Sequence, residues 1–105
     1  MWLPFISITD LSFLRRGDYV DISITPHSQK YFSDPNYDFY FPNYRGKVIS
    51  STARTLDELM IKDLSGKTIY CIDRAGTSGF ITGKYYRSST EEDPFMDLLG
   101  GTETD

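Results

Sequence analysis

The sequence predicts a single, mainly β domain built as a small barrel or sandwich of about five short strands. Residues 18–26 alternate strictly between polar and apolar side chains, which is typical of a half-buried strand. Four further short apolar runs follow residue 46, separated by turns at close spacing. The chain has 105 residues and is 15% aromatic, so we expect a modest core filled largely by Phe and Tyr.

The first predicted element is a short helix over residues 9–17. Thr9 can cap its start, and Gly17 suits its end. Leu11 and Leu14 lie three residues apart, so both would fall on one face of this helix.

The strands follow in order, beginning with residues 18–26, which Pro26 ends. The apolar residues of this strand share one face: Val20, Ile22 and Ile24. The other predicted strands cover residues 47–53, 58–64, 67–73 and 80–86. Ser65 and Gly66 are expected to form a hairpin turn, because glycine supplies the positive φ that such turns need.

A long connection, residues 26–46, is expected after the first strand, and it is unusually rich in rings. Pro35 and Pro42 prevent it from forming one regular element. Its seven aromatic residues are Tyr31, Phe32, Tyr37, Phe39, Tyr40, Phe41 and Tyr44. We expect about half of them to be buried, with Tyr37 and Tyr40 the most exposed. Tyr-rich loops are typical of protein interfaces, because they offer large rigid contacts with polar tips.

The pattern of strands and turns resembles the small-barrel superfolds, Src-homology-3-like and Tudor-like. Three stretches within residues 15–86 carry the resemblance: "RRGDYVDI", "YRGKVIS" and "LMIKDLSGKTI". It implies a five-stranded barrel whose long loop after the first strand lines the ligand surface, a role that falls on residues 31–44. The only tryptophan, Trp2, lies outside this region, so recognition of proline-rich peptides is not expected.

Charge divides the chain into a domain, residues 1–87, and an acidic tail, residues 88–105. The domain carries all 11 Lys and Arg and nine of the 15 Asp and Glu, a balance of +2, whereas the tail carries the other six acids. A short helix is expected over residues 93–100, with Phe95 and Leu98 on one face. That helix packs either on its own domain or on a partner.

The leading interpretation is a non-catalytic adaptor or inhibitor that binds a larger protein partner. Its candidate contacts are Tyr37, Phe39, Tyr40 and Tyr44 in the loop, and Phe95 and Leu98 in the tail.

The second interpretation is a single-stranded nucleic-acid-binding barrel with an autoinhibitory acidic tail. Rings can stack on unpaired bases while cations contact phosphates. The candidate cations are Arg45, Lys47, Lys62, Lys67, Lys84 and Arg87. Asp34 and Asp38 lie among the rings and repel phosphate, which favours the protein-binding interpretation.

No arrangement of residues predicts catalysis, a metal site or a cofactor. Cys71 sits within a predicted strand and His27 follows a proline in a loop, so a reactive Cys–His pair is not expected. Asp34, Asn36 and Asp38 alternate as at the start of a calcium loop, but later positions lack the required Gly and Glu.

A single cysteine favours a reducing compartment, because small secreted domains usually carry several disulfides. The N-terminal apolar stretch lacks a leading positive charge and is too short to span a membrane. An intracellular location is therefore expected. An exposed strand edge could also pair with a second copy of the chain.

Overall fold

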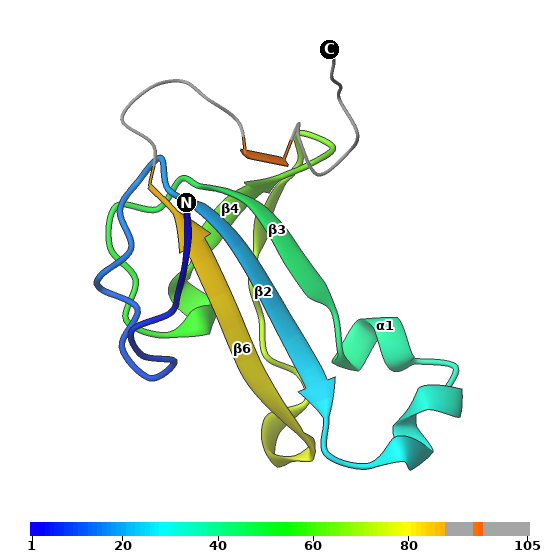
Figure 1. Ribbon diagram of the computed structural model, residues 1–105. Helices are drawn as coiled ribbons and strands as arrows, with labels where there is room; N and C mark the ends of the chain where they lie inside the picture. The colour runs from blue at the N-terminus through cyan, green and yellow to red at the C-terminus, as the bar shows by residue number, and fades with distance from the viewer. Residues whose placement is uncertain (88–93, 96–105) are drawn as a thin grey trace.

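The computed structural model describes residues 1–87 and 94–95. Their six strands form one antiparallel sheet (Figure 1). The strand order is β1-β6-β2-β3-β4-β5. The strands are β1 (Trp2–Pro4), β2 (Tyr19–Pro26), β3 (Asn43–Val48), β4 (Met60–Asp63), β5 (Thr68–Tyr70) and β6 (Gly79–Tyr86). Short helical turns occupy the connections: η1 (Gln29–Ser33), α1 (Tyr37–Tyr40), η2 (Leu56–Glu58) and η3 (Gly76–Ser78).

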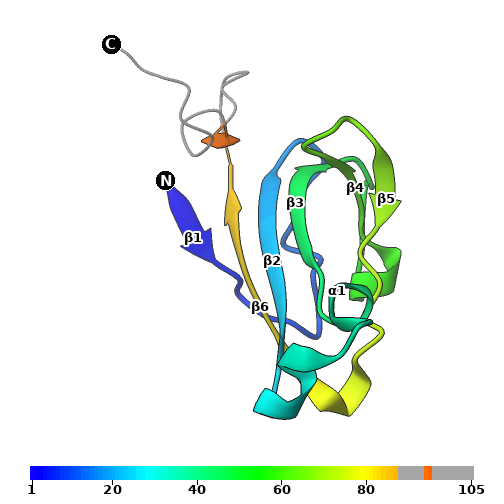
Figure 2. The same cartoon turned by 90° about the vertical axis from the view of Figure 1, so that its right-hand side faces the viewer.

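The sheet is curved but open. Figure 2 shows it edge-on, running from β1 on one side to β5 on the other. In the described part of the chain β5 pairs only with β4, and β1 pairs only with β6. The mainly β class is confirmed, whereas the closed five-stranded barrel is wrong, because β1 adds a sixth strand and the two edge strands do not meet.

The central strand β2 organises the core. It pairs with β3 on one side and along its whole length with β6 on the other. Val20, Ile22 and Ile24 are buried and point to one side of the sheet, which we call the inner face. The opposite side is the outer face.

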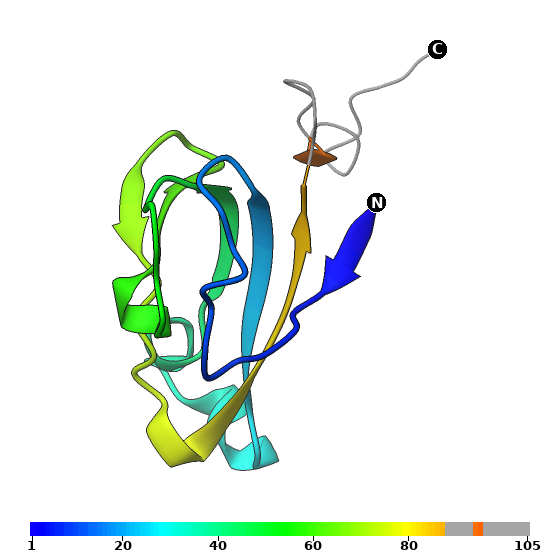
Figure 3. The ribbon, with the colours of Figure 1, turned by 90° about the vertical axis from the view of Figure 1, so that its left-hand side faces the viewer.

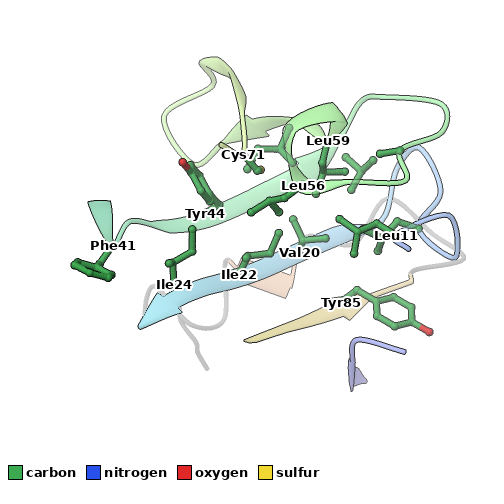
Figure 4. Packing of buried hydrophobic residues seen from close by; sticks show 14 residues of the cluster. Leu11, Val20, Ile22, Ile24, Phe41, Tyr44, Leu56, Leu59, Cys71 and Tyr85 are labelled. Atoms are coloured by element: carbon green, nitrogen blue, oxygen red, sulfur yellow. The ribbon is translucent and has the colours of Figure 1, made fainter. Parts of the chain in front are cut away.

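The inner face is covered by the connecting segments rather than by a second sheet (Figure 4). Leu11 and Leu14 come from the segment between β1 and β2, which runs along this side of the sheet (Figure 3). Leu56 and Leu59 come from the segment between β3 and β4. Each such fully buried side chain stabilises the fold by roughly 1.5–3 kcal/mol.

The helix expected over residues 9–17 does not form. The Leu11 amide donates to the Arg54 carbonyl (3.0 Å), and the Gly17 amide donates to the Val48 carbonyl (2.8 Å). The Leu11 amide would lack an intrahelical acceptor in any case, but the Gly17 amide, which would close the last turn of the helix, is bonded to β3 instead. This segment pins the second half of the domain to the start of β2.

The start of β3 differs from the prediction, whereas the hairpin turn after β4 agrees with it. β3 begins at Asn43 rather than at residue 47, so the long loop ends at Pro42. Gly46 lies on the inner side of β3, where an added Cβ would overlap the carbonyl oxygen of Lys62 on β4. The hairpin turn at Gly66 is confirmed, with φ of 87° in the connection between β4 and β5. The helix expected over residues 93–100 lies outside the described residues, apart from residues 94 and 95.

Candidate functional site

The loop between β2 and β3, residues 27–42, is shaped by hydrogen bonds within itself. Ser28 Oγ accepts from the Lys30 amide (3.4 Å) at the start of η1. Asp34 Oδ1 accepts from the Asn36 amide (2.8 Å) and begins the turn into α1. The loop therefore presents its rings from two defined turns beside the end of β2 (Figure 1).

Two of the seven loop rings anchor this segment in the core. Phe41 and Tyr44 are buried, and the Tyr44 hydroxyl donates to the Ile72 carbonyl (2.8 Å) (Figure 4). Burial raises the pKa of the Tyr44 hydroxyl. Tyr44, predicted as a partner contact, belongs to β3 rather than to the loop, and its alternation with Gly46 and Val48 turns its ring into the core.

The remaining rings lead from the core to the surface. Tyr31 and Tyr37 are half-buried, with ring centroids 5.4 and 5.3 Å from that of Phe41. Phe32 stacks on Tyr37 at 5.4 Å and is 60% exposed. The exposed ring of Phe32 therefore contacts Tyr37, which in turn contacts Phe41 in the core.

Phe39 and Tyr40 are the other exposed rings, at 54% and 40%. They meet edge to face at 5.2 Å. The Arg74 guanidinium lies 4.3 Å from the centroid of Phe39, a close cation–π contact. Thus Tyr40 is exposed as predicted, whereas Tyr37 is less exposed than Phe32.

A hollow of about 350 Å³ lies between this loop and the turn before β6. Seven residues line it: Tyr31, Asp34, Tyr40, Phe41, Arg74, Ala75 and Ser78. Tyr31 and Ser78 join the two walls by a hydrogen bond between their hydroxyls (3.4 Å). Asp73 Oδ1 accepts from the amides of Ala75 and Gly76, which fixes the turn that carries the second wall. We call this feature the loop hollow.

Sequence reasoning missed Arg74, which lines the loop hollow, and the high exposure of Phe32, which does not line it. Arg74 lies in the stretch "DRAGTSG", which reads as an ordinary turn, and its distance from Phe39 in sequence hides their contact. Phe32 was one ring among seven, and the sequence pattern does not show that it is more exposed than Tyr37 and Tyr40.

The outer face of the sheet gathers most of the predicted cations. Residues directly opposite each other on neighbouring strands point to the same side. One row crosses five strands: Lys62, Lys47, Tyr19, Tyr86 and Trp2. A second row comprises Arg45, Asp21, Lys84 and Pro4.

Three of the four cations on this face contact a ring or a carboxylate of a neighbouring strand. Lys47 Nζ is 5.8 Å from the Tyr19 ring centroid, and Lys84 Nζ is 5.3 Å from that of Trp2. Arg45 Nε contacts Asp21 Oδ1 at 3.3 Å. A shallow hollow of about 260 Å³ opens between Asp21, Arg45 and Lys84.

The other two predicted cations lie elsewhere. Lys67 is exposed in the turn between β4 and β5. Arg87 forms an ion pair with Asp18, with Nη2 2.8 Å from Oδ2 and Nε 3.1 Å from Oδ1. The hydrogen bond to Asp18 raises the pKa of Arg87. Arg87 also donates to the Phe13 carbonyl (2.7 Å), so it holds the segment before β2 in place.

The tail contributes two described residues, Pro94 and Phe95, both buried, and Phe95 is 2% exposed. Its ring centroid lies 5.3 Å from that of Trp2 and 6.0 Å from that of Tyr19. Phe95 therefore packs on its own domain, at the Trp2 end of the outer face. Leu98 lies outside the described residues.

Cys71 lies in the core, and His27 lies against a ring on the surface. Cys71 is fully buried, and burial raises the pKa of its thiol to about 12, so the reactive thiolate is suppressed. The His27 ring lies 5.3 Å from that of Phe80 on the surface. Across the residues that the structure describes, no three or more His, Cys, Asp or Glu side chains gather to hold a metal ion.

Comparison with known proteins adds no relative: no family model matches the chain, and no curated protein or solved structure is significantly similar to it. Within residues 1–87 and 94–95 there is no helix long and apolar enough to cross a membrane.

Proposed function

We propose that this domain is a non-catalytic protein-binding module whose loop hollow receives an apolar segment of a partner protein. The observation that carries the proposal is a hollow of about 350 Å³ that exposed Tyr40 helps to line, with two further exposed rings, Phe32 and Phe39, on the same loop. Large exposed rings gathered in one place mark interaction surfaces, because leaving them in water is unfavourable.

The loop is already ordered for such a contact. Phe41 and Tyr44 fix its end in the core, and the Tyr31–Ser78 bond joins the two walls of the loop hollow. A partner would therefore meet rings whose positions are set, and little side-chain entropy would be lost on binding. Aromatic and Arg side chains in such settings commonly dominate the binding energy.

The kind of partner segment follows from the lining. The apolar rings favour an aromatic or long aliphatic side chain, with Asp34 and Arg74 beside it to meet polar groups of the partner backbone. Trp2 pairs with the far end of β6, away from the loop hollow, which does not favour proline-rich peptides.

The test is selection of binders from a random peptide library displayed on phage, followed by affinity measurement with purified peptides. We expect enriched peptides to carry an aromatic or long aliphatic residue. Phe39→Ala should weaken their binding about 30-fold, since truncating a central ring typically removes about 2 kcal/mol. Tyr37→Ala is less suitable, because Tyr37 also packs on Phe41 in the interior.

Tyr70→Ala is the matched control. Tyr70 is 51% exposed, similar to Phe39, but it lies on β5, whereas Phe39 contacts Tyr40 and Arg74 in the lining of the loop hollow. Its removal should leave peptide affinity unchanged. Equal losses in the two variants, or a library that yields no binder, would contradict the proposal.

A further inference from the structure

We propose that the outer face of the sheet binds single-stranded nucleic acid, independently of the loop hollow. The strand residues on this face include four cations and one carboxylate. The cations are Arg45, Lys47, Lys62 and Lys84, and the carboxylate is Asp21. Strands β3, β4 and β6 supply the cations, so the positive charge is spread across the sheet rather than along one edge.

The placement of Lys47 and Lys62 indicates an anionic partner. The two residues are directly opposite each other on β3 and β4. Like charges at such positions repel and destabilise the sheet. The neighbours across from them are Tyr19 and Thr68, which carry no negative charge. Among the described residues, only Arg45 of the four cations forms an ion pair. A phosphate between the two lysines would replace this repulsion with attraction.

The rings beside the cations favour a single strand over a duplex. The row that begins with Lys62 and Lys47 continues through Tyr86 to Trp2, and both of these rings are half-buried. Unpaired bases stack on such rings while cations meet the backbone. Five strands spaced about 4.8 Å apart span about 19 Å, enough for about four nucleotides. A duplex would hide its bases from the rings.

The chain's own acids compete for this face. Phe95 packs on Trp2 and Tyr19 at one end of the cation row. Asp93 and Asp97 each lie two residues from Phe95 in sequence. Because acids joined to Phe95 by so short a stretch of chain compete with an added polyanion, we expect them to weaken its binding. The four acids closest to Phe95 in sequence are Glu91, Glu92, Asp93 and Asp97.

The test is fluorescence anisotropy of a labelled oligo(dT) of twelve nucleotides with the full chain across a series of salt concentrations. The binding constant should fall with salt at a logarithmic slope of about −3, as expected for four phosphate contacts on a single strand. The variant Lys47→Gln/Lys62→Gln should reduce this slope by about 1.4 and weaken binding. The Phe39→Ala variant should bind oligo(dT) like wild type, which separates this proposal from binding at the loop hollow.

Matched variants make the result decisive. Lys30→Gln/Arg16→Gln changes net charge equally at two exposed positions off the outer face, and should leave the slope unchanged. Replacing the four acids near Phe95 by their amides should tighten binding in low salt. The proposal is overturned if this amide variant binds no oligo(dT), or if the two charge variants lose affinity equally. It is also overturned if poly-glutamate of equal charge binds as tightly, because the face would then select acidic protein.

Discussion

Replacing Arg87 by Met should lower the free energy of unfolding by about 2–3 kcal/mol. The carboxylate of Asp18 is 4% exposed and receives three hydrogen bonds, two from Arg87 and one from the Arg15 amide (2.9 Å). Met keeps an unbranched stem of similar length but removes both donors to Asp18 and the guanidinium, whose Cζ lies 5.3 Å from the Tyr85 ring centroid. A fully buried pair broken this way typically costs 3–5 kcal/mol. Arg87 is 37% exposed, so water replaces part of what it donates, and the smaller range applies.

Arg45→Met is the matched control, with the same change of side chain and charge. Its partner contact, to Asp21, is 3.3 Å long, and the Arg45 side chain is 50% exposed. Exposed ion pairs contribute less than about 1 kcal/mol. The comparison therefore isolates burial of the carboxylate as the cause of the larger loss.

The assay is urea denaturation followed by Trp2 fluorescence and by far-UV circular dichroism. The midpoint should shift for Arg87→Met while the slope with urea is preserved. Adding Asp18→Asn should recover part of the loss, because the variant no longer buries an unpaired charge. Equal destabilisation by Arg87→Met and Arg45→Met, or no recovery in the double variant, would refute the reasoning.

Three further predictions concern single buried groups. Raising the pH from 8 to 10 should remove about 1.4 kcal/mol of stability through Cys71. The unfolded thiol ionises near 9.0 while the folded thiol, with its pKa near 12, stays protonated, so stability is lost as pH rises; Cys71→Ala should flatten this part of the pH profile, and an unchanged profile would contradict it. Gly46→Ala should lower the free energy of unfolding by about 1–3 kcal/mol or more, because the added methyl group would overlap the Lys62 carbonyl. The melting temperature should fall accordingly, and a wild-type melting curve would count against this prediction. Phe95→Ala should cost about 3 kcal/mol and shift Trp2 emission to the red, whereas an unaltered spectrum would show that the two rings do not touch in solution.

The strands with strict alternation could be predicted from sequence, because burial on one face leaves a period of two. β2 follows that rule, and both β2 and β6 appear within one residue of the predicted ranges. β3 was misplaced because its inner face uses Tyr44 and Gly46, and neither residue reads as an apolar strand position. β1 was missed because three residues ending in Pro4 give too short a pattern to recognise.

The predicted helix over residues 9–17 failed for a reason that no local pattern contains. Its leucines have helical spacing, but the Gly17 and Leu11 amides are bonded to carbonyls about 30 to 40 residues away in the chain. The candidate site was likewise predictable only in part. The aromatic loop could be predicted from its composition, whereas the wall that Arg74 provides depends on how β6 returns beside β2.

The open sheet has consequences for self-association. Its two borders, β1 and β5, are only three residues long, so each offers few unpaired backbone groups to another chain. Pro4 removes one donor from β1, since proline has no amide hydrogen. The two edge strands therefore offer little template for the addition of further strands, the step by which a sheet extends into a fibril. Although the sheet is open, its edge strands are too short to favour pairing with strands of other molecules.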